Sequence, residues 1–189
     1  MTRQASDQRF AASRLLDGYL VVSAQAGDRR AADLLARRYH RRLVAHAWRL
    51  TGDEELAKDV VQSSWIDIAR GLPRLKDEAA FPAWAYQIVS RRCARSIRAL
   101  QGDRALSGAL RDDPGGGPTE PPEIATPRLQ AAIRSLPPHQ RAALALFYVD
   151  DLSVAEVAIA LDAPAGTIKT RLMHARRALR AVLEGDHHD

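Results

Sequence analysis

The stretch LSVAEVAIALDAPAGTIKTRLMHARRALRAVL, residues 152–183, carries the most specific local pattern in this chain. Near its start, Ser153 is followed three positions later by Glu156, a spacing typical of a capping box at the beginning of a helix. Residues 162–164, Asp-Ala-Pro, then form a short turn before a longer and strongly basic helix. A short helix, a tight turn and a longer basic helix are the outline of a helix-turn-helix, and the stretch predicts one.

The longer helix presents two different faces. Its apolar residues step by three and four and are expected to face a core: Ile168, Leu172, Ala175, Leu179 and Val182. The side chains left toward solvent are Lys169, Thr170, Met173, Arg176, Arg177 and Arg180, with Arg171 and His174 on the flanks. Such a helix fits the major groove of DNA, where its first residues reach base edges and later arginines neutralise phosphates. A solvated basic helix end, favoured by the helix dipole, is the alternative.

The composition is that of a folded protein. The 189 residues are 46% hydrophobic and 27% charged, which provides enough apolar side chain for a core. Lone Cys93 excludes a disulfide framework. The amino terminus lacks the apolar stretch of a signal peptide, and no run approaches the roughly 18 apolar residues of a membrane span. We therefore expect a soluble protein of the cytoplasm.

A segment rich in proline and glycine divides the chain. Residues 102–123 hold hardly any bulky apolar side chains, so they cannot bury enough surface to offset chain entropy. We expect a flexible linker there, with an ordered surface loop as the alternative. It separates a first lobe, residues 1–101, from a second lobe, residues 124–189. Neither lobe shows sustained strand alternation, so the prediction is an all-α fold of two small helical lobes, the second containing the helix-turn-helix.

Helical spacing of apolar residues places the individual helices. In the first lobe, apolar stripes run through residues 32–50, 55–72 and 81–89, and a shorter helix is expected around 15–26, giving a bundle of about four. Asp28 and Asp53 are the expected N-caps. In the second lobe, four shorter helices are expected at about 125–135, 138–148, 153–161 and 165–183.

Charge is unevenly distributed along the chain. A net charge of +5 and a pI near 9.9 favour a polyanionic partner. The helix over residues 53–67 is rich in acid, a pattern usually belonging to a solvated face, and Trp65 beside it is by default a core residue. The later stretch SRRCARSIR holds four arginines and no acid: Arg91, Arg92, Arg95 and Arg98. Two basic patches on linked lobes indicate two contacts with one long polyanion.

No pattern indicates catalysis. The histidines form no metal pair of the HExxH kind, and His187-His188 lies in a polar tail where incidental metal affinity is the simpler explanation. No phosphate loop, nucleophile elbow or Cys–His pairing is present in the sequence. We expect no enzymatic activity, no metal and no cofactor.

From about residue 15 to residue 183, the chain resembles the bacterial RNA polymerase sigma factors of the extracytoplasmic function (ECF) group. DVVQ, residues 59–62, is similar to the family's region-2 motif, which docks on the clamp helices of the largest polymerase subunit. FPAWAYQIV, residues 81–89, is similar to the aromatic segment that opens the helix for promoter melting and −10 reading. LPPHQRAALALFYVDDLSVAEVA and GTIKTRLMHARRAL are similar to region 4, which reads the −35 element.

The resemblance implies a transcription initiation factor that binds core RNA polymerase and directs it to −10 and −35 promoter elements. For polymerase docking it points to Asp59, Gln62 and Trp65. For −10 DNA it points to Arg91, Arg92, Arg95 and Arg98, with Phe81 and Trp84 as packing residues behind them. For the −35 major groove it points to Thr167, Lys169, Thr170, Arg171, Met173, His174, Arg176 and Arg177. The implied partners are the clamp helices and flap region of the polymerase, promoter DNA and an anti-sigma factor.

The chain departs from the family pattern at a few positions. Gln62 is followed by Ser63, where the family often has glutamate. Asparagine is common where Arg91 stands, and aspartate where Arg95 stands, so this lobe is more basic than the pattern. Asp162 occupies a turn position where glycine is frequent, and aspartate tolerates left-handed backbone geometry better than most residues.

Two other functions are compatible with parts of the sequence. A free-standing helix-turn-helix regulator would bind DNA without polymerase, but it has no need of DVVQ or of the aromatic segment at Phe81. A mimic that sequesters a partner of sigma factors has no need of the basic helix after Lys169. Together these features favour a working sigma factor.

Overall fold

The computed structural model describes the backbone of residues 2–107 and 127–184 and the side chains of residues 11–101 and 127–182. Within these ranges the regular structure is helical and there is no strand, which confirms the all-α prediction. The first lobe contains α1 (Thr2–Gln25), α2 (Arg29–Thr51), α3 (Glu54–Gly71), the 3-10 turns η1 (Leu72–Arg74) and η2 (Glu78–Ala80), and α4 (Phe81–Ser107). The second lobe contains α5 (Pro127–Ser135), α6 (Pro138–Tyr148), α7 (Val154–Ala160) and α8 (Ala165–Glu184).

Helices of the first lobe begin where the sequence supplies capping groups. The carboxylate of Asp28 accepts a hydrogen bond from the backbone N–H of Arg30, and that of Asp53 accepts one from Leu56. Both predicted N-caps are confirmed, and each satisfies a backbone donor that the first helical turn leaves unpaired. Between the two helices, Gly52 ends α2 at a φ of 73°, a left-handed conformation that glycine adopts without strain.

The apolar stripes of the first lobe form its core. Phe81, at the start of α4, is fully buried, and its ring meets Tyr39 of α2 edge-on with centroids 5.1 Å apart. Trp84, one turn further, is half-buried and packs over Gly71 at the end of α3. These aromatic residues therefore hold α4 against α2 and α3. The other stripe residues that lie in the core include Leu35, Leu43, Ala47, Val60, Val61, Ile68, Ala85 and Val89.

Two helices of the first lobe are longer than the sequence pattern predicts. α1 begins at Thr2 rather than near residue 15, and α4 continues to Ser107, past residue 102, where the linker was expected. Gly102 costs a helix interior only about 1 kcal/mol. Extending an existing helix is far easier than starting a new one, so α4 continues through the glycine. The rest of the expected linker, residues 108–123, lies outside the described residues.

Helices α7 and α8 form the expected helix-turn-helix. The hydroxyl of Ser153 accepts a hydrogen bond from the backbone N–H of Glu156, and the Glu156 carboxylate accepts one from the N–H of Ser153, which completes the predicted capping box. The turn holds Asp162 at a φ of 50°, in the left-handed region. The predicted core face of α8 is buried at Ile168, Leu172 and Ala175.

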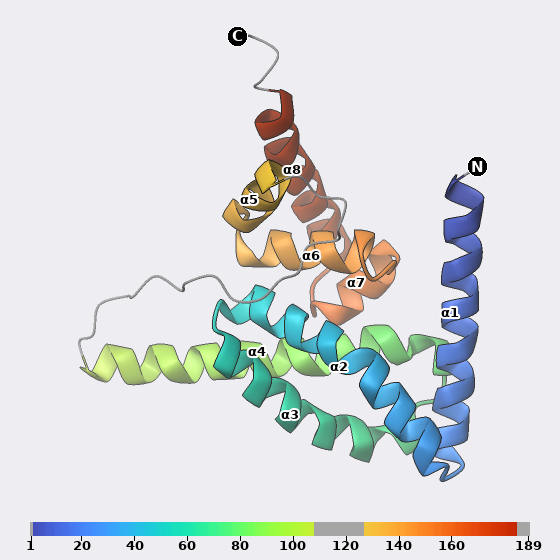
Figure 1. Cartoon of the computed structure of the whole chain (residues 1–189). Helices are drawn as coiled ribbons and strands as arrows, with labels where there is room; N and C mark the ends of the chain where they lie inside the picture. Colours follow the sequence, from blue (N-terminus) through green and yellow to red (C-terminus); the bar gives the residue numbers. More distant parts are fainter. Residues whose placement is uncertain (1, 108–126, 185–189) are drawn as a thin grey trace.

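The two lobes pack against each other. Figure 1 shows the second lobe lying along one side of the first, with α6 next to α2 and α7 next to α4. Buried apolar residues of both lobes belong to one continuous cluster, which includes Leu43 and Val89 of the first lobe and Leu146 and Val157 of the second. The packing brings the turn between α7 and α8 beside the basic helix α4.

Candidate functional site

The outward face of α8 carries most of the residues predicted to contact DNA. Met173 is 55% exposed, which leaves this apolar side chain available for contact with the methyl group of a thymine. Arg171 and His174 are half-buried at the flanks of the face. The remaining predicted contacts on α8 are exposed: Thr167, Lys169, Thr170, Arg176 and Arg177.

The surroundings of two arginines of α8 affect how well each can contact DNA. Arg176 Nε donates a hydrogen bond of 2.8 Å to the hydroxyl of Tyr148, and its guanidinium lies 5.7 Å from the ring centroid of Phe147. These contacts fix an exposed cation on the helix surface. In contrast, burial lowers the pKa of Arg171, and its Nη1 has no hydrogen-bond partner among the described residues. Arg171 is therefore a weaker candidate for DNA contact than its exposed neighbour Lys169.

The four arginines of α4 have different environments. Arg92 is half-buried and donates to the carboxylate of Asp67 on α3 at 2.7 Å, an ion pair that ties the two helices together. Arg95 and Arg98 are exposed, and neither has an ion-pair partner in the part of the chain that the structure describes. Arg91 is also exposed, but its guanidinium is bound by the second lobe.

One face of α3 presents the residues predicted to dock on polymerase. Asp59 and Gln62 are exposed on it together with Ile66, which is 52% exposed. Trp65 is half-buried, and its indole Nε1 lies 3.2 Å from His40 Nδ1 on α2, to which it donates a hydrogen bond. An exposed isoleucine among polar side chains offers a partner protein an apolar contact with a polar rim.

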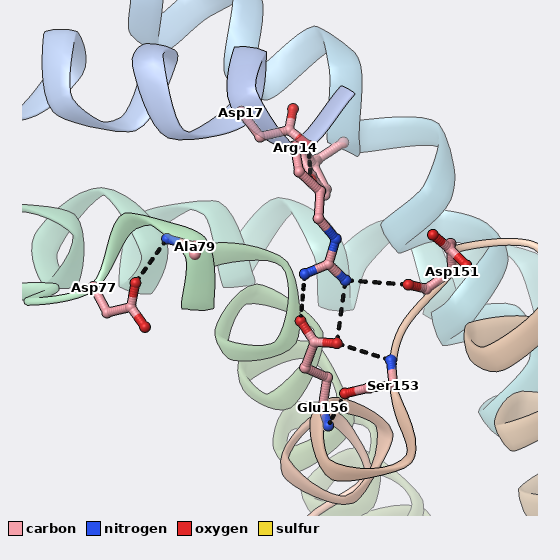
Figure 2. Close-up of polar contacts among 8 residues, drawn as sticks. Arg14, Asp17, Asp77, Ala79, Asp151, Ser153 and Glu156 are labelled. Carbon is pink, nitrogen blue, oxygen red and sulfur yellow. Dashed lines mark hydrogen bonds and ion pairs between the residues drawn. The ribbon is translucent and has the colours of Figure 1, made fainter. Parts of the chain in front are cut away.

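Arginine side chains of the first lobe meet acidic side chains of the second. Figure 2 shows Arg14 of α1 reaching the capped start of α7, where it donates to both carboxylate oxygens of Glu156 at 2.7 and 3.1 Å. Arg14 also donates to the backbone carbonyl of Asp151 at 3.1 Å. Burial alone would raise the pKa of Glu156, but the hydrogen bonds from Arg14 and Ser153 outweigh it and hold that pKa below its ordinary value.

A second contact joins α4 to the turn of the helix-turn-helix. Arg91 binds the Asp162 carboxylate through two atoms, with Nη2 3.1 Å from Oδ1 and Nε 3.2 Å from Oδ2. Gln87, one turn earlier on α4, donates to the same carboxylate at 3.3 Å. The hydrogen bond from Arg91 lowers the pKa of Asp162 and keeps the carboxylate ionised. An arginine predicted to contact −10 DNA is thus occupied by an acid from the other lobe.

A third contact lies deeper between the lobes. The carboxylate of Asp150 is 3.9 Å from Arg42 Nε. Arg49, which is 9% exposed, also attracts this carboxylate electrostatically. Burial raises the pKa of Asp150 and lowers that of Arg49. In the opposite direction, Arg141 of α6 donates to the backbone carbonyl of Arg49 at 3.0 Å and lies 5.1 Å from the ring centroid of Trp48.

Within the described ranges, no three His, Cys, Asp or Glu side chains gather as a possible metal site. The tail histidines His187 and His188 lie outside those ranges. None of the helices, over the residues that could be searched, is long and apolar enough to span a membrane.

Comparison with known proteins places this geometry in one family. Residues 35–102 match Sigma-70 region 2, and residues 127–179 match Sigma-70, region 4. The RNA polymerase sigma-H factor of Pseudomonas aeruginosa is 30% identical over 181 residues, 89% of this chain and 94% of that protein. The ECF RNA polymerase sigma-E factor of Salmonella typhimurium is 31% identical over 182 residues, 88% and 93% of the two chains.

The fold agrees with these sequence matches. The solved complex of the sigma factor RpoE with the anti-sigma factor NepR from Bartonella quintana contains a similar chain, with a TM-score of 0.67 and 20% identity over 82% of this chain and 98% of that one. The chain belongs to the ECF group of RNA polymerase sigma factors. It is a polymerase-binding transcription initiation factor.

Several residues that shape these surfaces are not predicted by the sequence pattern. Ile66 could have been found, since it is a large apolar residue standing off the apolar stripe of α3. Tyr148, which holds Arg176, gives no such signal. Neither does the pairing of Asp162 with Arg91, because it depends on how the two lobes pack.

Proposed function

We propose that the first lobe docks on core RNA polymerase through the exposed face of α3 and captures −10 DNA with α4, while the second lobe holds duplex −35 DNA on α8. The lobes would be residues 1–101 and 124–189, with residues 102–123 spanning between them. The supporting observation is that one chain combines an exposed basic recognition helix with a separate exposed surface around Asp59, Gln62 and Ile66. DNA binding alone has no use for the second surface.

Each DNA-binding surface has residues suited to a different task. On α8, the early residues Lys169, Thr170 and Met173 would reach base edges in the major groove, and the later Arg176 and Arg177 would contact phosphates. On α4, Arg95 and Arg98 are available for the single-stranded −10 backbone in the present arrangement. The function is binding without chemistry, so no cofactor is needed.

The proposed partners follow from the same surfaces. The α3 face would meet the clamp helices of the largest polymerase subunit, and the second lobe would meet the flap region. We also propose an anti-sigma partner, since the related RpoE chain was solved with the anti-sigma factor NepR. Because core polymerase is the main partner, the protein would act in the bacterial cytoplasm.

A reconstituted transcription reaction tests the proposal. Purified chain and bacterial core polymerase are combined on a pooled library of genomic promoter fragments, and run-off transcripts are sequenced. The expected result is a discrete set of transcripts that needs both components and whose start sites share two upstream elements. Polymerase binding without any transcript would overturn the promoter-reading part of the proposal, and failure to bind polymerase would overturn the docking part.

Matched variants make the docking assignment specific. Asp59→Ala is expected to reduce transcription and polymerase binding together. Asp33→Ala removes the same charge from an exposed site on α2, where Asp33 pairs with Arg37, and is expected to leave both unchanged. Equal losses in the two variants would contradict the assignment of the α3 face.

A further inference from the structure

The acidic residues of the second lobe have an unusual distribution. Four of them have described side chains, and each lies beside an arginine of the first lobe: Asp150 by Arg42, Asp151 and Glu156 by Arg14, and Asp162 by Arg91. We call Asp150, Asp151, Glu156 and Asp162 the acidic row. Lys169, Arg176 and Arg177 of α8 are exposed, whereas the acidic row lies against arginines of the first lobe, so the second lobe carries charges of opposite sign in two places.

The packed arrangement cannot read a whole promoter at once. The −10 and −35 elements are about 25 base pairs apart by their numbering, which is roughly 85 Å along duplex DNA. Arg91 contacts Asp162, and Lys169 follows Asp162 by only seven residues, a stretch that could span no more than about 25 Å even if fully extended. The two DNA-reading surfaces are therefore several times too close together, and the contacts of the acidic row must break before both can bind.

We propose that the acidic row is an intramolecular docking surface for the arginines of the first lobe, and that Asp162 competes with promoter DNA for Arg91. The proposal rests on the proposed function of α4. A bidentate carboxylate occupies the guanidinium positions that a DNA phosphate would otherwise take. In the free chain Arg91 is thereby kept from −10 DNA, which weakens binding by α4, while the α3 face around Ile66 stays exposed and open to polymerase.

The exposure of the Arg91–Asp162 ion pair suits a contact between the lobes that has to break. Asp162 and Arg91 are each more than half exposed, so their pair is screened by salt and contributes little by itself. Asp151 and Asp162 are also the non-glycine residues with positive φ in the described chain. The chain keeps a charged group at a strained position, where it faces Arg91.

The first test measures closure of the lobes without polymerase or DNA. Donor and acceptor dyes are placed at Arg37→Cys on α2 and Arg134→Cys on α5, both exposed sites, while buried Cys93 stays unlabelled. Energy transfer in the full chain is expected to fall in Glu156→Gln/Asp162→Asn, in which the introduced glutamine can still complete the capping box with Ser153. Unchanged transfer in this variant overturns the docking role of the row.

A charge swap tests the individual pair. Arg91→Asp and Asp162→Arg are each expected to lower energy transfer, and the double variant Arg91→Asp/Asp162→Arg is expected to recover it. Lack of recovery, with all variants showing wild-type melting by circular dichroism, would mean that this pair does not hold the lobes together.

The second test measures competition with DNA. A fluorescent single-stranded DNA 12-mer of randomised sequence is titrated with the full chain at low salt. Asp162→Asn, which keeps a residue tolerant of left-handed geometry, is expected to bind roughly two- to fivefold more tightly than wild type. Asp33→Asn changes the net charge equally but lies on α2, away from the row, and is expected to show a smaller gain.

Equal gains in the two variants, or no measurable binding by Asp162→Asn, overturn competition for Arg91. Both tests omit polymerase, so they can succeed even if the chain directs no transcription. Conversely, the chain could direct promoter-specific transcription although its lobes never close. That result would leave the proposed function standing and would reject only the docking role of the acidic row.

Discussion

The imidazole Nε2 of His46 lies 2.8 Å from the hydroxyl oxygen of Ser90, joining α2 to α4 in the interior of the first lobe. His46 is fully buried, and its Nδ1 has no hydrogen-bond partner among the described residues. A charged imidazolium in this position would lose its hydration without gaining a counter-ion. Burial, with a smaller contribution from Arg49, therefore lowers the pKa of His46 to about 3.

Because of the buried His46, we expect the protein to lose stability as soon as the pH falls below about 6.5. In the unfolded chain a histidine has a pKa near 6.5, so below that pH the unfolded state binds a proton that folded His46 refuses. The contribution of neutral His46 to stability is therefore present above pH 6.5 and is lost as pH falls toward 3. Between pH 8 and pH 5 we expect a loss of about 2 kcal/mol, measured by urea unfolding.

The control is His46→Gln, whose amide can still reach Ser90 and does not titrate. Its stability should depend much less on pH in the same window, where most carboxylates remain ionised. An identical pH dependence in wild type and His46→Gln would show that other groups are responsible.

Gly71 predicts a test of how tightly the first lobe is packed. A Cβ added at this position would lie 2.6 Å from the Trp84 ring, closer than atoms can approach without movement. Since Trp84 is a rigid ring wedged between α3 and α4, Gly71→Ala is expected to cost about 1–3 kcal/mol, seen as a lower Tm. Gly166→Ala, where nothing lies within 4 Å of the added Cβ, should keep or slightly raise the Tm. An unchanged Tm in Gly71→Ala would mean that the Trp84 ring is free to move.

The exposed face of α3 predicts a specific loss of polymerase binding. Ile66→Ser removes an apolar side chain that is 52% exposed, so the fold should remain intact. We expect the Kd for core polymerase to rise roughly fivefold, the equivalent of about 1 kcal/mol, in a fluorescence anisotropy titration. Leu34→Ser on α2 removes a side chain that is 55% exposed and serves as the matched control. Similar losses of affinity in both variants would indicate nonspecific hydrophobic association and not docking at α3.

The exposed face of α8 predicts a change in salt dependence. Arg176→Ala should weaken binding to duplex promoter DNA recovered from the transcription assay and make the slope of log K against log salt shallower by about 1, as expected for one lost phosphate contact. Arg134→Ala removes an exposed cation from α5 in the same lobe and should leave the slope unchanged. If Arg176→Ala lowers affinity with no change in slope, then Arg176 does not contact a phosphate.

The helices and their caps could be predicted because their causes are local. Asp28, Asp53 and the Ser153–Glu156 box sit within three residues of the groups they cap, and the buried stripes repeat at helical spacing. The contact between Arg91 and Asp162 could not be predicted in this way, because it joins residues 71 positions apart through packing of separate lobes. For the same reason, four arginines that look equivalent in SRRCARSIR turn out to have different environments on α4.

The continuous core has a consequence for temperature. Apolar residues of both lobes share one cluster, so parting the lobes on a promoter exposes apolar surface to water as well as breaking ion pairs. Newly hydrated apolar surface raises the heat capacity, which makes the opening equilibrium curved in temperature instead of following a straight van't Hoff line. Closure should be strongest at an intermediate temperature and weaken on both sides, so opening of the lobes would be favoured by cold as well as by heat.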